Sequence, residues 1–296
     1  MIRALFKAMR PKQWAKNVFI FAGIVFDGRI FDLRRLLCSL AAFAIFCLIS
    51  SAVYLLNDLA DIEKDRQHPV KRNRPLASGA LKPAVAWVAT VVLFATMLPL
   101  AFLLNSGFGW FALLYAVMMV AYSFLLKNIV IIDVMTIAAG FVIRVFAGTA
   151  VAEVTRFSPW LYLCTILLAL FIAINKRRHE IILLAAGAEG HRASLQEYTR
   201  EYLDIMTSLV TATVIAAYSF YTFTAPNLPD NHTMMLTIPL VIYGIFRYLY
   251  LIHVKNLGGA PEDIALGDVP LMVAMALWGL VSGLVIYWPT IRAFFA

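Results

Sequence analysis

The side chains best suited to chemistry in this 296-residue chain form an acidic run at the end of a long apolar segment. Asp58, Asp61 and Asp65 are spaced i, i+3, i+7, and Asn57 precedes them. On a helix, this spacing places the three carboxylates on one face. Converging carboxylates repel one another unless a cation lies between them, and Mg²⁺ commonly bridges such carboxylates to substrate phosphates. The spacing therefore predicts a magnesium site formed by these three aspartates.

A basic run follows the acidic one and includes Lys71, Arg72 and Arg74. Guanidinium and ammonium groups bind phosphate oxygens. Charged residues at a helix end can also be a solvated cap, but the acidic spacing and the adjoining cations together favour a site for a metal and a diphosphate. We expect this site at a membrane surface.

The composition requires most of the chain to be membrane-embedded. Hydrophobic residues make up 62% and charged residues 14%, whereas soluble domains carry roughly 25% charged residues. The mean hydropathy is +0.82. Crossing ~30 Å of hydrocarbon takes about 20 residues of helix. We predict an all-α, polytopic protein that forms a single domain over residues 1–296. The nine predicted transmembrane segments lie near residues 14–31, 35–57, 83–104, 108–126, 129–151, 158–175, 202–224, 233–255 and 268–290.

The distribution of Lys and Arg predicts the orientation. Of the 25 basic residues, 18 fall on the side of the N-terminus and of the loops after the even-numbered segments, and five fall on the other side. The positive-inside rule places the richer side, with the active-site loops, in the cytoplasm. The net charge of +8 suits anionic lipid headgroups or anionic substrates, and we find no nucleic-acid-binding motif. No cleavable signal peptide is expected, and the isolated cysteines match no metal site.

Several motifs identify a family resemblance. The run from Asn57 to Asp65, N-D-x-x-D-x-x-x-D, followed by H-P-x-K-R-x-R-P-L-A-S-G, resembles the first aspartate-rich motif of the UbiA superfamily of intramembrane prenyltransferases. The segment Arg10–Asn17, R-P-K-Q-W-A-K-N, is similar to the signature of the decaprenyl-phosphate phosphoribosyltransferase branch. Further motifs similar to that branch lie at residues 122–127, 143–148 and 175–180. The resemblance covers essentially the whole chain and implies a UbiA-like bundle of nine helices.

One departure from the wider superfamily supports this branch. Aromatic prenyltransferases carry a second aspartate-rich motif in the loop between segments 6 and 7, where this chain has Lys176, Arg177 and Arg178. A basic motif at that place suits an anionic group, such as a lipid monophosphate or a sugar phosphate. We expect at least one of the three residues to contact substrate and the others to anchor the helix.

The resemblance implies a specific reaction. The donor is 5-phosphoribosyl-1-diphosphate, the acceptor is a polyprenyl phosphate, and the products are polyprenyl-phosphoryl-5-phosphoribose and diphosphate. Asp58 and Asp61, with Asp65, hold Mg²⁺ on the leaving diphosphate, and Asn57 orients the metal or the donor. A phosphate nucleophile is already ionised at pH 7, so no general base is needed. The product feeds the arabinose donor for cell-wall glycans in organisms that make them.

Other basic and aromatic side chains are candidate substrate ligands. The sequence leaves open whether each of them binds substrate or has a structural role. Lys12 and Lys16 flank an interfacial tryptophan and serve as membrane anchors or phosphate ligands. Lys127, shortly after Tyr122, is expected at a turn and is a candidate phosphate ligand, while Tyr122 is expected to line the groove for the isoprenoid tail. Arg144 lies deep in a segment, where an unpaired cation is costly, so it requires an acidic partner or a phosphate.

Two other functions are open from the sequence. One is a UbiA-type enzyme that joins a prenyl diphosphate to an aromatic acceptor, against which the basic run at residues 176–178 argues. The other is a non-catalytic lipid-binding or transport protein. Transporters place charges and broken helices near the bilayer midplane, whereas the charges of this chain gather at one face.

Overall fold

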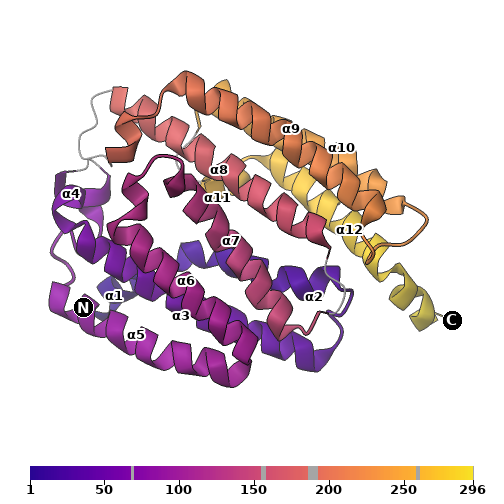
Figure 1. The fold of residues 1–296 in the computed structure, drawn as a ribbon, viewed down its shortest axis with the longest axis horizontal. Coiled ribbons are helices and arrows are strands. Elements are labelled where there is room, and N and C mark those ends of the chain that lie inside the picture. Colours follow the sequence, from indigo (N-terminus) through magenta and orange to yellow (C-terminus); the bar gives the residue numbers. More distant parts are fainter. Residues whose placement is uncertain (68–69, 155–157, 186–192, 258–260, 296) are drawn as a thin grey trace. The chain divides into compact units, whose positions relative to one another are not determined.

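The computed structural model describes residues 1–67, 70–154, 158–185, 193–257 and 261–295, and helices are the only regular elements among them (Figure 1). The predicted all-α membrane fold is confirmed. Eight helices are long and apolar enough to cross a membrane in the described part of the chain. They are α3 (Leu33–Ala60), α5 (Pro83–Leu104), α6 (Ser106–Phe124), α7 (Ile132–Val151), α8 (Pro159–Ala185), α9 (Arg200–Thr224), α10 (Ile238–His253) with the preceding 3₁₀ turn η5 (Thr233–Thr237), and α12 (Val269–Phe295).

The first predicted segment, 14–31, differs from the others. It consists of a 3₁₀ helix, η1 (Pro11–Phe21), followed by the short helix α2 (Ala22–Phe26). A 3₁₀ helix rises ~2.0 Å per residue, so η1 and α2 together extend roughly 30 Å, which is the thickness of the hydrocarbon core. The nine predicted segments thus correspond to eight α-helical spans and one segment that is largely 3₁₀.

The chain divides into two compact units. The first comprises Met1–Val25, Arg29–Thr155 and Leu183–Tyr198. In this unit α3 packs against α5, α6 and η1, and α7 packs against α6 and η1. The fully buried side chains of its core include Ile20, Phe46 and Phe108. Around this core lie three short elements, α1 (Ile2–Ala8), α4 (Ile62–Gln67) and η2 (Lys71–Asn73).

The second unit comprises Phe26–Gly28, Arg156–Ile182 and Thr199–Ala296. Its core joins α8, α9, α10 and α12 with the short helix α11 (Pro261–Gly267). Arg247 of α10 is paired with Asp268, which precedes α12; Nε–Oδ1 is 3.0 Å and Nη2–Oδ2 is 2.8 Å. Arg247 falls within a predicted apolar segment, residues 233–255, and Asp268 is its acidic partner. A single domain over residues 1–296 stays a prediction.

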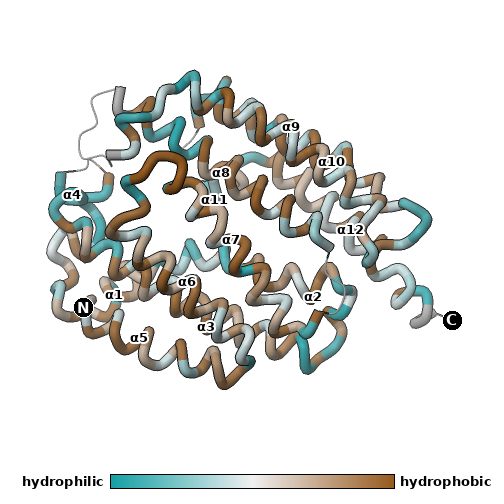
Figure 2. The backbone as a smooth tube through the Cα atoms, viewed as in Figure 1, coloured by the Kyte–Doolittle hydropathy of each residue, from teal (hydrophilic) through white to brown (hydrophobic). Residues whose placement is uncertain are grey.

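The hydropathy pattern follows the membrane-spanning architecture. Apolar residues line the long helices, and hydrophilic residues gather at turns and helix ends, as around α4 (Figure 2). The helix α5 is the clearest lipid-facing element, because only 11% of its most apolar window is buried inside the protein. Its exposed side chains include Trp87, Val88 and Leu103. The protein is therefore a multi-pass membrane protein.

Candidate active site

The acidic motif spans the end of α3 and the start of α4, within the first unit. Asp58 lies in the last turn of α3 and is 1% exposed. Asp61 ends the helix with φ −107° and ψ 12°, and α4 begins at the next residue. Two backbone hydrogen bonds continue across the break: Asp61 N–H donates to Asn57 O at 3.1 Å, and Asp65 N–H donates to Asp61 O at 2.8 Å. The motif is therefore helical with a local distortion at Asp61.

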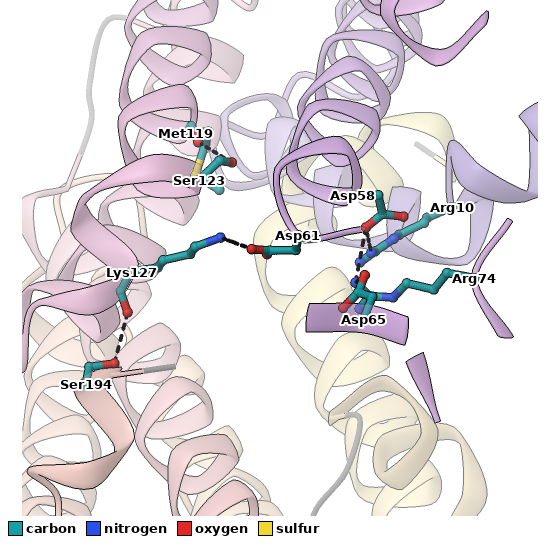
Figure 3. A network of polar contacts seen from close by, with 9 residues as sticks. All are labelled: Arg10, Asp58, Asp61, Asp65, Arg74, Met119, Ser123, Lys127 and Ser194. Atoms are coloured by element: carbon teal, nitrogen blue, oxygen red, sulfur yellow. Dashed lines mark hydrogen bonds and ion pairs between the residues drawn. The ribbon is translucent and has the colours of Figure 1, made fainter. Parts of the chain in front are cut away.

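Asp58 and Asp65 converge on one cation. Nη1 of Arg74 lies 3.1 Å from Oδ1 of Asp58 and 2.7 Å from Oδ2 of Asp65 (Figure 3). A guanidinium of Arg10 also donates to Oδ1 of Asp58. Both carboxylates are almost fully buried, so each would carry a large desolvation cost without these charge-assisted hydrogen bonds.

Asp61 points away from that pair. Its two carboxylate oxygens each lie 2.7 Å from Nζ of Lys127, which belongs to the 3₁₀ turn η3 (Leu126–Asn128) between α6 and α7 (Figure 3). The prediction that all three carboxylates share one face is therefore wrong for this arrangement. The distorted backbone at Asp61 and the charge of Lys127 separate it from Asp58 and Asp65.

The carboxylates of the acidic motif are suitable ligands for Mg²⁺. In the described part of the chain, however, no three Asp, Glu, His or Cys side chains lie close enough together to bind one metal ion. Carboxylate oxygens are the ligands that Mg²⁺ prefers. One nitrogen of Arg74, Nη1, contacts an oxygen of Asp58 and an oxygen of Asp65, so both carboxylates can bind a positive charge at this position. The two carboxylates thus fit a common cation, and the assignment of Asp58, Asp61 and Asp65 as metal ligands stays a prediction.

Arg10 is a site residue that the sequence did not single out, although it opens the R-P-K-Q-W-A-K-N signature. It adopts a left-handed conformation, φ 55° and ψ 62°, at the start of η1. Further along η1, Trp14 Nε1 donates to Ser51 Oγ at 3.0 Å and Asn17 Nδ2 donates to Ser50 Oγ at 3.1 Å. These contacts attach η1 to α3 and so position Arg10 beside Asp58. The signal was the signature itself, in which Arg10, Trp14 and Asn17 contact side chains of α3.

Arg144 lies in α7 and is 5% exposed. Its Nε donates to Asn17 Oδ1 at 2.7 Å, its Nη1 to Gly140 O at 2.7 Å and its Nη2 to Tyr115 Oη at 2.9 Å. The guanidinium carbon also lies 4.6 Å from the centroid of the Tyr115 ring and 5.3 Å from that of Phe141. Among the described residues its partners are neutral acceptors and aromatic faces, so the predicted acidic partner is not found there.

The basic run at residues 176–178 lies inside α8, in the second unit, and not in a loop as expected. Nη1 of Arg177 is 2.6 Å from Oε2 of Glu180, and Nε of Arg178 is 2.6 Å from Oδ1 of Asp204. Both arginines are almost fully buried, whereas Lys176 is half-buried. The Arg177–Glu180 pair lies within α8, whereas the Arg178–Asp204 pair joins α8 to α9. Contact of these arginines with substrate stays a prediction.

The remaining predicted ligands belong to the first unit. They differ in accessibility: Lys12 and Arg72 are exposed, Asn57, Lys16 and Lys71 are half-buried, and Tyr122 is 6% exposed. Lys71 and Arg72 lie in η2, directly before Arg74. The structure thus brings Arg74 and Lys127 to the acidic motif, together with Arg10.

The sequence is similar to known proteins over nearly its full length. A model of the UbiA prenyltransferase family matches residues 17–262. A decaprenyl-phosphate phosphoribosyltransferase of Corynebacterium glutamicum is 34% identical over 280 residues, which are 93% of this chain and 84% of that protein. The protein of the same name from Mycobacterium tuberculosis is 33% identical, over 94% of this chain and 92% of the relative.

Solved structures agree with the fold. A UbiA homologue from Archaeoglobus fulgidus bound to GPP and Mg²⁺ superposes with a TM-score of 0.71 and 18% identity, over 96% of this chain and 99% of that one. The predicted resemblance, and with it the expectation of a membrane-embedded transferase, is confirmed. The chain belongs to the UbiA prenyltransferase family.

Proposed function

We propose that the chain transfers phosphoribose from 5-phosphoribosyl-1-diphosphate to a polyprenyl phosphate of the decaprenyl type, at the cytoplasmic face of the cell membrane. The bond between ribose C1 and the diphosphate breaks, and diphosphate leaves with the electron pair. An oxygen of the lipid phosphate forms the new bond to C1. Support comes from relatives of 31–34% identity over more than nine tenths of the chain that share the name decaprenyl-phosphate phosphoribosyltransferase.

The observation that carries the proposal is the pairing of three cations with three carboxylates. Arg10 and Arg74 neutralise Asp58 and Asp65, and Lys127 neutralises Asp61. A diphosphate competes with these carboxylates for the same donors, since both are anionic oxygen acceptors. Each guanidinium or ammonium group then donates to a phosphate oxygen, where it stabilises the charge that develops on the leaving group.

When the three cations move from the carboxylates to the diphosphate, the aspartates become available to bind a metal. Mg²⁺ held by Asp58 and Asp65 would neutralise and orient the leaving diphosphate. Asp61 would join these two ligands once Lys127 has turned to the diphosphate, and Asn57 would orient the metal or the donor. The lipid phosphate is ionised at neutral pH, so the chain need not remove a proton from the nucleophile. Arg177 and Arg178 pair with Glu180 and Asp204, and contact of the basic run at residues 176–178 with an anionic substrate group remains part of the proposal.

The test is a transfer assay with the purified full-length protein in detergent. Phosphoribosyl diphosphate labelled in the ribose is supplied with a polyprenyl phosphate and either Mg²⁺ or EDTA, and the label is followed into the organic phase. We expect labelling that requires Mg²⁺. The Asp58→Asn and Asp61→Asn variants should abolish it, while Asp230→Asn, at an exposed loop position, should keep wild-type turnover.

The same preparation tests the second function. A prenyl diphosphate and an aromatic acid are supplied in place of the sugar donor and the lipid phosphate. Prenylation of the aromatic acid, with no label transferred from phosphoribosyl diphosphate at any lipid length, would contradict the proposal and place the chain with the aromatic prenyltransferases. Full activity of the two aspartate variants would contradict the site assignment.

A further inference from the structure

The turn that carries Lys127 is held by residues far along the chain. Lys127 belongs to η3, between α6 and α7, and its side chain is 4% exposed. The backbone carbonyl of Lys127 accepts a hydrogen bond from the hydroxyl of Ser194 at 2.9 Å (Figure 3). Ser194 is fully buried and lies in the 3₁₀ turn η4 (Ala193–Gln196) of the same unit.

A second contact holds the chain that leads from η3 into α7. The hydroxyl of Tyr198 accepts a hydrogen bond from Ile131 N–H at 2.7 Å and donates one to Asp133 Oδ1 at 2.8 Å. Tyr198 is 4% exposed and Asp133 is fully buried. One phenol thus joins the backbone before α7 to the first turn of that helix.

The backbone that Tyr198 holds is in a rare conformation. Ile131 has φ 67° and ψ −46°, and the N–H of Ile132 donates to the carbonyl of Val130 at 2.8 Å. This is a γ-turn with positive φ, which is strained, and its central residue is β-branched. Such conformations persist only where the surrounding structure imposes them. Tyr198 supplies that constraint through the N–H of the strained residue itself.

We infer that Ser194 and Tyr198 are positioning residues that fix the η3 turn and thereby place the Lys127 ammonium at Asp61. The two residues are four positions apart on one segment. Ser194 holds the middle of η3 at the carbonyl of Lys127, and Tyr198 holds the chain between η3 and α7 at Ile131. The inference deepens the proposed function, on which the catalytic importance of Lys127 rests. The placement of the Lys127 side chain can be measured without any turnover.

The first measurement is the acylation rate of individual lysines in the full-length protein in detergent, followed by peptide mass spectrometry. Lys82, which is exposed, serves as the internal standard. We expect Ser194→Ala and Tyr198→Phe each to raise the acylation rate of Lys127 roughly three- to tenfold, the equivalent of one hydrogen bond. An unchanged rate in both variants would overturn the inference.

Matched controls separate this effect from a general loosening of the fold. Ser219→Ala removes a hydroxyl whose partner among the described residues is Ile215 O of its own helix, and Tyr243→Phe removes the hydroxyl of an exposed tyrosine. Both should leave the acylation rate of Lys127 at the wild-type value. An equal increase in the controls would show that any lost hydroxyl has this effect and would overturn the inference.

The second measurement is a double-mutant cycle in the transfer assay. Ser194→Ala and Tyr198→Phe should each lower turnover roughly three- to tenfold in the wild-type background and have no further effect in Lys127→Ala. Independent losses in both backgrounds would overturn a role through Lys127. If the chain transfers no phosphoribose at all, the proposed function fails, and the acylation rates alone decide on the positioning role.

Discussion

The ammonium group of Lys127 lies 2.7 Å from both carboxylate oxygens of Asp61, although 66 positions separate the two residues in the chain. The pair connects the turn between α6 and α7 to the distorted end of α3. Because the two side chains are 4% and 16% exposed, each would be a poorly solvated charge without the other.

This pair allows stability and activity to be separated. Lys127→Met leaves Asp61 without its cation and should destabilise the protein by about 3 kcal/mol, the cost of breaking a buried pair. The double variant Asp61→Asn, Lys127→Met removes both charges and should recover most of the unfolding temperature, measured by fluorescence in detergent. Both variants should keep only a small residual transfer of phosphoribose, because both groups serve the substrate. Recovery of turnover in the double variant would mean that the pair is structural.

The sequence predicted the membrane segments well, because the length and apolar character of a helix are local properties. It also identified the acidic motif and the cations at residues 74 and 127. The direction of Asp61 was not predictable from spacing, since it depends on φ −107° at the end of α3. The pairing of Arg178 with Asp204 was likewise missed, because it joins neighbouring helices whose packing the spacing of residues does not report.

Arg74 is expected to be replaceable, in part, by a divalent cation. Arg74→Ala leaves the carboxylates of Asp58 and Asp65 facing each other without the shared guanidinium, so the unfolding temperature should fall. Added Mg²⁺ should restore it, and should do so less in a variant that also carries Asp58→Asn, which removes one oxygen ligand with its charge. The measurement is the unfolding temperature as a function of Mg²⁺ concentration.

The same variant should lose turnover. Removal of a charge-assisted hydrogen bond to an anionic substrate costs about 1.5–3 kcal/mol, so kcat/KM for the donor should fall roughly 10- to 100-fold. Arg34→Ala is the matched control, since its side chain is 82% exposed and lies on α3 far from the acidic motif in sequence. Arg34→Ala also controls the Mg²⁺ measurement. If added Mg²⁺ raised the unfolding temperature of Arg34→Ala as much as that of Arg74→Ala, a cation site between Asp58 and Asp65 would be contradicted.

Arg144 is expected to act through the position of η1. Lysine at this position keeps the charge but cannot donate to Asn17, Gly140 and Tyr115 together, because it lacks the planar fork of arginine. Arg144→Lys should therefore lower the free energy of unfolding by about 2 kcal/mol, with Tyr115→Phe costing about 1 kcal/mol. If Arg144→Lys kept the wild-type unfolding temperature and raised KM for the lipid phosphate, the arginine would be a substrate ligand.

At Gly148, η1 and α7 approach each other closely. A Cβ atom built on this residue would lie 1.9 Å from the carbonyl oxygen of Ile20 and 2.7 Å from its carbon, both of which are backbone atoms. Gly148→Ala should therefore push η1 away from α7 and destabilise the protein by about 1–3 kcal/mol, as overpacking does. Since η1 carries Asn17 and directly follows Arg10, turnover should fall in parallel. Gly279→Ala in α12, where a Cβ meets nothing within 4 Å, should instead be neutral or stabilise by up to about 1 kcal/mol, because alanine favours the helix. Equal unfolding temperatures for the two variants would contradict the close approach of η1 and α7.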